Sequence, residues 1–448
     1  MTWGVRVRAE STPIEPELVY ASVGSRHAGS RVILSATSGG FQEQRRPSNA
    51  NRSVHRYRVR AVIVIVGGGI CGLGIGWQLA RRGADVTVLE RDKAGRAATW
   101  AAAGMIAARA EVEHGEEALL PLAVESASMW EGFARDLEAE SGIGLDYRSE
   151  GTIVAALDRD DLEYLEDRFA FFQTLGLDVE WLSGYAARQR EPHLARAVTG
   201  AILSKDDHQV DNRQVALALR AAFLAAGGVL REKCAVDEIL VVGGQVTGVR
   251  TGMEEIEAAA VVLAAGAWSR NIDGLPHIAR PPVRPLKGQM LSIAMDPRAP
   301  LLDHVVWGPG NGIVPGIYLA PKSDGRLIVG ATVEEMGFDT GMTAGGLFEL
   351  LRAAWELLPG IYDQPVIESW AGLRPASRDD APILGPTAVD GLVLATGHHR
   401  NGILLAPVTA VKIADYLLDG TFDSLLEPFL LDRFAGGNIR AAVAADAL

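Results

Sequence analysis

The sequence is poor in cysteine, and its basic residues are outnumbered by acidic ones. Only Cys71 and Cys234 occur among 448 residues, which excludes a disulfide framework and a multi-cysteine metal site and is typical of the reducing cytoplasm. The 43 Lys and Arg face 56 Asp and Glu, so the formal net charge is -13. This acidic balance argues against nucleic acid as the main partner, because phosphate binding requires a basic surface.

The remaining composition is that of a globular protein with a sizeable core. Hydrophobic residues make up 48% and charged residues 22%, and the length indicates two or three domains. Residues 1–60 differ, because they hold ten Arg, no Lys and four acidic residues without a sustained apolar period. We expect this segment to be poorly ordered. Its composition favours a non-native upstream extension over an organelle transit peptide.

Residues 61–80 carry no charge for twenty positions, and hydropathy alone would predict a membrane span there. The pattern within the segment indicates otherwise. A six-residue apolar run ends at a glycine cluster that contains Gly67, Gly69 and Gly72. A short apolar strand followed by a glycine turn and a helix is typical of a dinucleotide-binding unit. The sequence therefore predicts no membrane span, and no basic amphipathic anchor is visible either.

The Gly67-x-Gly69-x-x-Gly72 spacing is a dinucleotide fingerprint. Gly67 allows the tight turn, Gly69 lets the backbone approach a pyrophosphate, and Gly72 lets the helix pack on the strand. The helix N-terminus offers free N–H groups to the phosphates. Glu90 follows a second expected strand, 86–89, where an acid accepts a ribose hydroxyl and repels a 2'-phosphate. FAD or NAD is therefore expected rather than NADP.

Two later segments favour FAD. Residues 261–268 form an apolar run that ends in small residues, which gives a surface for a nucleotide. Residues 397–407 form a glycine-bounded turn before an expected helix at 406–418. A second helix N-terminus beside the cofactor would stabilise the negative charge of a reduced flavin. His398 and His399 in this turn lack the neighbours that a metal site needs.

Further periodic segments predict the supporting elements. The apolar spacing of Trp130, Phe133 and Leu137 indicates an amphipathic helix within 115–140. Helices are also expected near 160–175 and 213–226, and strands at 151–156, 179–183 and 233–236. The aspartates of segment 206–212 are expected to be turn and cap residues, with a catalytic role as the less favoured alternative.

Seven segments in consistent order resemble the FAD-dependent D-amino-acid oxidase superfamily, and within it the glycine oxidases of thiamine (thiazole) biosynthesis. The segments are 67–72, 97–105, 266–269, 285–289, 325–332, 370–375 and 397–407. The resemblance runs from about residue 61 to about residue 435 and does not cover the first 60 residues.

The resemblance implies an α/β (α+β) fold with two domains that alternate along the chain. A Rossmann-like FAD-binding domain would comprise 61–112, 200–275 and 368–440, and a substrate-binding domain built on an antiparallel sheet would comprise 113–199 and 276–367. It also implies noncovalent FAD, and by analogy alone a homo-oligomer. Related sarcosine oxidases tether flavin through a C-terminal cysteine, and this chain has none after Cys234.

The resemblance carries a set of FAD contacts over by position. They are Gly67, Gly69, Gly72, Glu90, Arg91, Thr99, Ala102, Ala103, Gly104, Met105, Val236, Trp268, His398, Arg400, Asn401, Gly402, Ile403 and Leu404. The last six of these would surround the isoalloxazine ring, and Arg400 would also reach the substrate.

Arg374 is the expected substrate clamp. Its guanidinium can grip a carboxylate bidentately, and it sits in an apolar frame where a stray charge would be costly. The resemblance adds Tyr318 as a second carboxylate contact and Arg400 at the substrate edge. Some glycine oxidases carry a His two positions before this Tyr, where the chain has Gly316. The pocket mouth is therefore expected to differ.

The expected reaction is the oxidation of glycine, or another small amine or D-amino acid, to an imine, with oxygen reduced to hydrogen peroxide. Such chemistry requires orientation more than an acid or base, and no acid–base constellation stands out in the sequence. The alternatives are a D-amino-acid dehydrogenase or oxidase of broader specificity with another electron acceptor, and, more remotely, a non-catalytic nucleotide-binding regulator.

Overall fold

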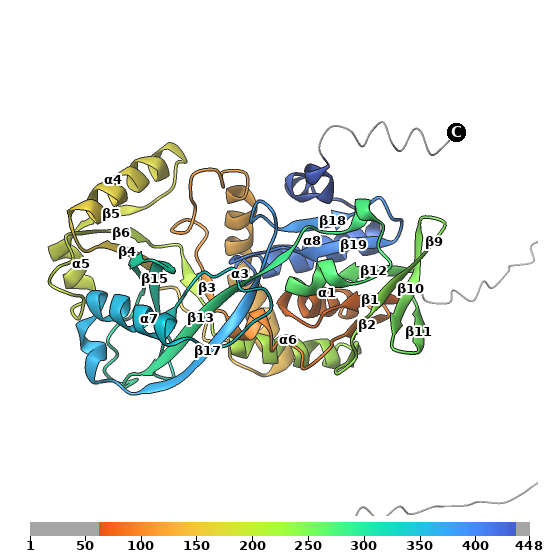
Figure 1. Ribbon diagram of the computed structural model, residues 1–448, viewed down its shortest axis with the longest axis horizontal. Helices are drawn as coiled ribbons and strands as arrows, with labels where there is room; N and C mark the ends of the chain where they lie inside the picture. The colour runs from red at the N-terminus through yellow and green to blue at the C-terminus, as the bar shows by residue number, and fades with distance from the viewer. Residues whose placement is uncertain (1–61, 436–448) are drawn as a thin grey trace, which may run out of the picture. The chain divides into compact units, whose positions relative to one another are not determined.

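The computed structural model describes residues 62–435, so both expectations for residues 1–60 lie outside the described residues. Two large sheets organise this part of the chain (Figure 1). No helix within residues 62–435 is both long and apolar enough to cross a bilayer. The uncharged segment 61–80 instead forms a strand, a turn and a helix, as its glycine pattern predicted.

The first sheet has six strands in the order β18-β19-β12-β1-β2-β8. All neighbours pair in parallel except β18 and β19. Its strands are β1 (Ile63–Val66), β2 (Val86–Leu89), β8 (Val229–Arg231), β12 (Ala260–Leu263), β18 (Ile383–Pro386) and β19 (Leu392–Thr396).

Both faces of this sheet are covered, which explains why β1 is an unbroken apolar run. Ile63 and Ile65 pack into a core with four helices, and Val64 and Val66 pack into a core with a small three-stranded sheet. The helices are α1 (Ile70–Ala80), α3 (Leu120–Ser141), α6 (Asn212–Ala225) and α8 (Ala406–Asp419), and the small sheet comprises β9 (Glu238–Val242), β10 (Gln245–Thr251) and β11 (Glu254–Glu257).

The second sheet has eight strands in the order β17-β13-β16-β15-β14-β4-β6-β5. Its neighbours are antiparallel, except that β14 and β4 are parallel. Its strands are β4 (Thr152–Ala156), β5 (Glu180–Ser183), β6 (Gly200–Ser204), β13 (Arg284–Ala294), β14 (Val305–Asn311), β15 (Val314–Pro321), β16 (Arg326–Gly330) and β17 (Val366–Ala376).

Alternation along β15 decides which side chains reach the site. Ile317 and Leu319 pack under α7 (Ala344–Leu357), while Tyr318 and Ala320 point to the opposite face. Helices α4 (Arg159–Thr174) and α5 (Gly184–Arg190) cover the β4–β6 end. The remaining short elements are α2 (Ala98–Ala101), β3 (Met105–Ile106), β7 (His208–Gln209), η1 (Gly266–Asn271), η2 (His277–Ala279), η3 (Pro359–Asp363), η4 (Ser424–Phe429) and η5 (Leu431–Phe434).

The predicted fold class is confirmed, and so are the helices expected around residues 115–140, 160–175, 213–226 and 406–418. The strand predicted at 233–236 is wrong, because Lys233 has a positive φ of 55° and breaks the extended backbone. The domain boundaries stay a prediction. Strands β6 and β17 pair in the eight-stranded sheet, although the predicted boundaries assign most of both to the FAD-binding segments.

Candidate active site

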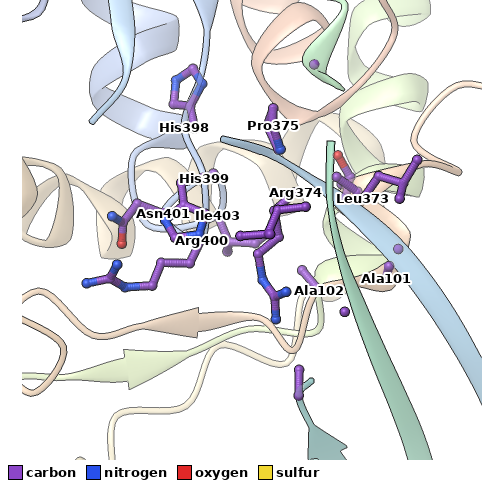
Figure 2. Close-up of a pocket in the computed structure, with 18 of the residues that line it drawn as sticks. Ala101, Ala102, Leu373, Arg374, Pro375, His398, His399, Arg400, Asn401 and Ile403 are labelled. Atoms are coloured by element: carbon purple, nitrogen blue, oxygen red, sulfur yellow. The ribbon is translucent and has the colours of Figure 1, made fainter. Parts of the chain in front are cut away.

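A cavity of about 940 Å³ extends from the carboxyl ends of β1, β2 and β12 to the inner face of the eight-stranded sheet. It is lined by every predicted FAD and substrate residue except Gly72, which packs behind the turn. Figure 2 shows Arg374 and Arg400 reaching into this region from neighbouring segments, with their guanidinium groups apart from each other. The structure thus brings residues from 67 to 404 into one site.

The glycine fingerprint has the geometry that its spacing predicted. Gly67 has φ +109°, and a Cβ there would lie 2.4 Å from the carbonyl oxygen of Ala264. A Cβ on Gly72 would lie 1.9 Å from the carbonyl oxygen of Gly67, so any side chain would push α1 off the turn. A Cβ on Gly69 would meet nothing closer than Oγ1 of Thr99, at 3.5 Å. The space beside Gly69 is therefore open for a ligand.

Glu90 lies at the end of β2 and is fixed by two backbone groups. Its Oε2 accepts a hydrogen bond from the N–H of Gly68 at 2.8 Å, and its Oε1 accepts one from the N–H of Asp92 at 2.9 Å. The next residue, Arg91, lies with its guanidinium 3.5 Å from the ring centre of Trp268. These residues form a polar and aromatic wall at this end of the cavity.

Phe338 supports this wall by packing on Trp268, although it does not line the cavity itself and the sequence did not indicate it. Its ring stacks on Trp268 with the ring centres 5.4 Å apart. Phe338 precedes α7 and is seventy residues from Trp268, in a loop that carries no nucleotide-binding pattern. Nothing local in the sequence could have placed it there.

Arg374 is a partly buried cation on β17 that lies opposite Leu286 of β13. Its Nη1 donates to the carbonyl oxygens of Thr332 at 3.1 Å and Lys287 at 3.4 Å. Gly288 makes room for the guanidinium, since a Cβ there would lie 2.5 Å from Nη1. Within residues 62–435, no carboxylate forms an ion pair with Arg374. Burial lowers its pKa and Tyr318 opposes this, so an external anion would be strongly favoured beside it.

Tyr318 presents a neutral hydroxyl next to this arginine. Burial raises the pKa of Tyr318 to about 12, and the charge of Arg374 opposes the shift. The hydroxyl oxygen accepts from the guanidinium of Arg374, and the group also lies 3.6 Å from Sδ of Met290, so its hydrogen atom can still be donated to a ligand. The aromatic ring packs against Trp307, with ring centres 5.1 Å apart. Beside that tryptophan, a Cβ on Gly316 would remain 3.8 Å from the indole.

Arg400 is already neutralised, unlike Arg374. Its Nη2 donates to both carboxylate oxygens of Glu116, at 2.6 and 2.8 Å, and to the carbonyl oxygen of Glu111. Its Nε also lies 3.5 Å from Oε2 of Glu111. Neither acid could be assigned to Arg400 from the sequence, because the two lie 289 and 284 residues away from it. Arg400 lines the cavity, but its charge is committed to this loop.

The turn before α8 is held by buried polar contacts. Nε2 of His398 lies 3.1 Å from Oγ1 of Thr409 and 3.5 Å from Sγ of Cys71. Burial lowers the pKa of His398 to about 4, so the ring is neutral at physiological pH. The carbonyl oxygen of Leu404 accepts hydrogen bonds from Ser126 and Trp130 of α3. The N-terminus of α8 is thus fixed beside the cavity.

Residues 63–416 match the family described as FAD dependent oxidoreductase, DAO. The chain belongs to this family. It is 38% identical over 374 residues to the bifunctional protein ThiO/ThiG of Trichormus variabilis, covering 83% of this chain and 55% of that protein. The chain thus spans about half the length of these bifunctional relatives. It is 35% identical over 387 residues to glycine oxidase of Geobacillus kaustophilus, covering 85% of this chain and 98% of that enzyme.

The fold supports the same grouping. The crystal structure of glycine oxidase from Geobacillus kaustophilus superposes with a TM-score of 0.76 at 35% identity, covering 84% of this chain and all of that chain. The predicted family and the prediction of FAD as cofactor are confirmed by membership of the FAD-dependent family. The roles assigned to single residues of the cavity stay predictions. What the structure shows is that these residues lie around one cavity.

Proposed function

We propose that this protein is an FAD-dependent glycine oxidase. It would convert glycine or a similarly small amine to the imine, which water hydrolyses to glyoxylate and ammonia, while oxygen is reduced to hydrogen peroxide. Its products would supply the thiazole step of thiamine biosynthesis. The observation that carries the proposal is Arg374, a partly buried guanidinium that pairs with no carboxylate of residues 62–435, beside the hydroxyl of Tyr318. A carboxylate on the substrate would complete this pair.

The residues at the other end of the cavity fit FAD. The turn at Gly67 excludes a side chain, and the open space beside Gly69 lies at the N-terminus of α1, where the N–H group of Ile70 donates to Oγ1 of Thr99. Glu90 has a fixed carboxylate at the end of β2, where a ribose would lie. When bound, FAD supplies the two-electron oxidation of the substrate C–N bond and the passage of those electrons to oxygen.

The protein's own residues would bind and orient the substrate. Arg374 would hold the carboxylate in a bidentate geometry, and Tyr318 would donate its hydroxyl to the same group. These two contacts fix the position of Cα relative to the flavin site and raise the effective concentration of the reacting atoms. The fixed N-terminus of α8 would stabilise negative charge that develops beside it.

We further propose that the FAD is bound noncovalently. Cys71 lines the cavity, but burial raises the pKa of its thiol to about 12, which suppresses the reactive thiolate. Acid precipitation should therefore leave all the flavin in the supernatant. A cytoplasmic location and a homo-oligomeric state also belong to the proposal, and size-exclusion chromatography with light scattering tests the second of these.

The deciding experiment measures peroxide release by the purified holoenzyme with glycine, sarcosine, D-alanine and D-proline. Glycine or sarcosine should be preferred, and Arg374→Ala should abolish the activity while flavin remains bound. Arg298→Ala is the matched control, because Arg298 is exposed and pairs only with Asp296. Flavin bleaching without peroxide would support the dehydrogenase alternative, and a preference for D-proline would contradict a small-amine site.

A further inference from the structure

Glu111 is a buried acid of the cavity that the proposed reaction leaves without a role. Its side chain is 12% exposed and follows the flavin-site segment at Met105 by six residues. No described residue donates a hydrogen bond to its carboxylate. Its closest partner is Nε of Arg400, at 3.5 Å from Oε2.

The groups around Glu111 leave its charge poorly compensated. The Nη2 of Arg400 is committed to Glu116, which accepts at 2.6 and 2.8 Å. Arg168 of α4 is also near, but its guanidinium donates to the carbonyl oxygen of Ala110. The negative charge of the buried Asp207 also acts on Glu111, and the Asp207 carboxylate accepts from the N–H groups of Arg109 and Ala110. Two acids and two partly engaged arginines therefore surround Glu111.

Glu111 shares its cavity with the two residues of the predicted substrate clamp. Its negative charge acts on both Tyr318 and Arg374, since it raises the pKa of each. All three side chains line the same cavity. A glycine whose carboxylate lies on Arg374 and Tyr318 carries its ammonium group one carbon further on. Within this cavity, Glu111 is the acid whose charge both clamp residues sense.

We propose that Glu111 takes the proton from the ammonium group of the bound substrate, an inference that rests on the proposed amine oxidation. The N–H bond of the ammonium breaks, a new O–H bond forms on the Glu111 carboxylate, and the nitrogen keeps the electron pair. The product is a neutral amine, which is the form that can be oxidised at Cα. Atoms and charge balance within the pair, and no further reactant is required.

The electrostatics of the site suit this transfer. Burial raises the pKa of Glu111 to about 7, with Arg400 opposing the shift and Asp207 and Glu116 adding to it. A carboxyl group that titrates near neutral pH can accept a proton and release it again within one turnover. Glu116 is less suited, because it is bound directly to Arg400 and does not line the cavity.

The first test is the pH profile of kcat/KM for glycine. In the wild-type enzyme kcat/KM should rise with pH through an apparent pKa near 7. In Glu111→Gln it should fall about 100-fold at pH 7 and then rise about tenfold per pH unit, as free amine becomes available. Glu111→Asp should restore part of the activity. Glu117→Gln, an exposed acid of the same loop that does not line the cavity, should keep the wild-type profile.

The second test needs no turnover. Acetate has the carboxylate of glycine without its amine, and its binding to the holoenzyme can be followed by the flavin spectrum. In the wild-type enzyme acetate should bind about tenfold more weakly at pH 8.5 than at pH 6, because ionised Glu111 repels the anion. This pH dependence of acetate binding should vanish in Glu111→Gln. It should persist in Glu111→Asp, which keeps an ionisable carboxyl group.

The outcomes separate the inference from the proposed function. Suppose that Glu111→Gln binds flavin and keeps the wild-type pH dependence of both kcat/KM and acetate binding. This result would overturn the role of Glu111 but would not contradict the proposed oxidase function. If Glu111→Gln lost its flavin, kcat/KM of Glu111→Asp would decide, because a partial loss of activity would support the role of Glu111 and wild-type activity at every pH would overturn it. Acetate that failed to perturb the wild-type flavin, together with no peroxide from any amine, would instead overturn the proposed function.

Discussion

Oδ2 of Asp211 accepts a hydrogen bond from Nη2 of Arg326, which lies 115 residues further along the chain. Oδ1 of the same carboxylate caps α6 by accepting from the N–H groups of Arg213 and Gln214. One buried side chain therefore ties a helix of the six-stranded sheet to a strand of the eight-stranded sheet. The cap role that the sequence predicted for the aspartates of segment 206–212 is thus confirmed at Asp211, whereas the carboxylate of Asp207 accepts from the distant N–H groups of Arg109 and Ala110.

Asp211→Ala should lower the free energy of unfolding by about 2 to 3 kcal/mol. About 1 kcal/mol comes from the lost helix cap, and the rest from a partly buried arginine that loses one of two partners. Asp324→Ala is the control, because Asp324 is exposed and also pairs with Arg326, so its loss should cost under about 1 kcal/mol. Urea unfolding of the holoenzymes measures both values. Equal costs would refute a special role for Asp211.

The fingerprint glycines should separate folding from cofactor binding. In Gly72→Ala the new Cβ would collide with the backbone of Gly67, so the protein should fold poorly or lose several kcal/mol of stability. In Gly69→Ala the Cβ finds room in the protein but intrudes on the space for a pyrophosphate. This variant should keep the melting temperature of the apoprotein within a few degrees and bind FAD at least tenfold more weakly. Thermal scans and FAD titration of the apoproteins distinguish the two.

The contrast between these glycines and Glu111 shows how far the sequence could predict the site. The strand, turn, helix and Glu90 all lie within thirty residues, so their spacing alone carries the nucleotide-binding geometry. The pairing of Arg400 with Glu111 and Glu116 joins segments that are far apart in the chain, so no local sequence pattern predicts it. In the sequence, Glu111 and Glu116 resemble the acidic residues of any solvent-exposed loop.

The prediction of the sheet topology from sequence was limited in the same way. Local patterns predicted some of the strands, such as β1, β2, β4 and β5, but not which strands lie side by side. Strand β17 pairs with β13, some eighty residues earlier, and so belongs to the eight-stranded sheet. Strand β6 lies between β4 and β5 although it follows both in the chain. Such long-range pairings depend on the packing of the whole core, and local spacing does not record them.

Tyr318→Phe should raise the KM for glycine about three- to tenfold and leave the protein folded. The hydroxyl makes a weak contact with Met290 and accepts from Arg374, which keeps the carbonyl oxygens of Thr332 and Lys287 as partners when the hydroxyl is removed. The loss should equal one hydrogen bond to the substrate carboxylate, about 1 kcal/mol. Steady-state kinetics and a thermal scan measure this. A large fall in kcat at unchanged KM would show that Tyr318 acts in the chemical step instead.

The raised pKa of Glu111 predicts how stability depends on pH. Its folded-state pKa of about 7 lies above the ordinary value of 4.5, so the folded state binds more protons between these pH values. Its contribution to stability therefore falls as the pH rises from about 4.5 to 7, and is constant above that. Asp207, whose pKa burial raises to about 6, contributes in the same direction.

Glu111→Gln removes one of these two contributions. The variant should match the wild-type stability near pH 4.5 and exceed it at pH 8, by at most about 3 kcal/mol for a shift of this size. The variant gains stability because a neutral amide, unlike the Glu111 carboxylate, carries no charge that must be desolvated on folding. Arg400 keeps its contacts with Glu116. Urea unfolding at pH 5 and pH 8 tests this. A variant less stable than the wild type at pH 8 would mean that the Arg400 ion pair outweighs the cost of burying the Glu111 carboxylate.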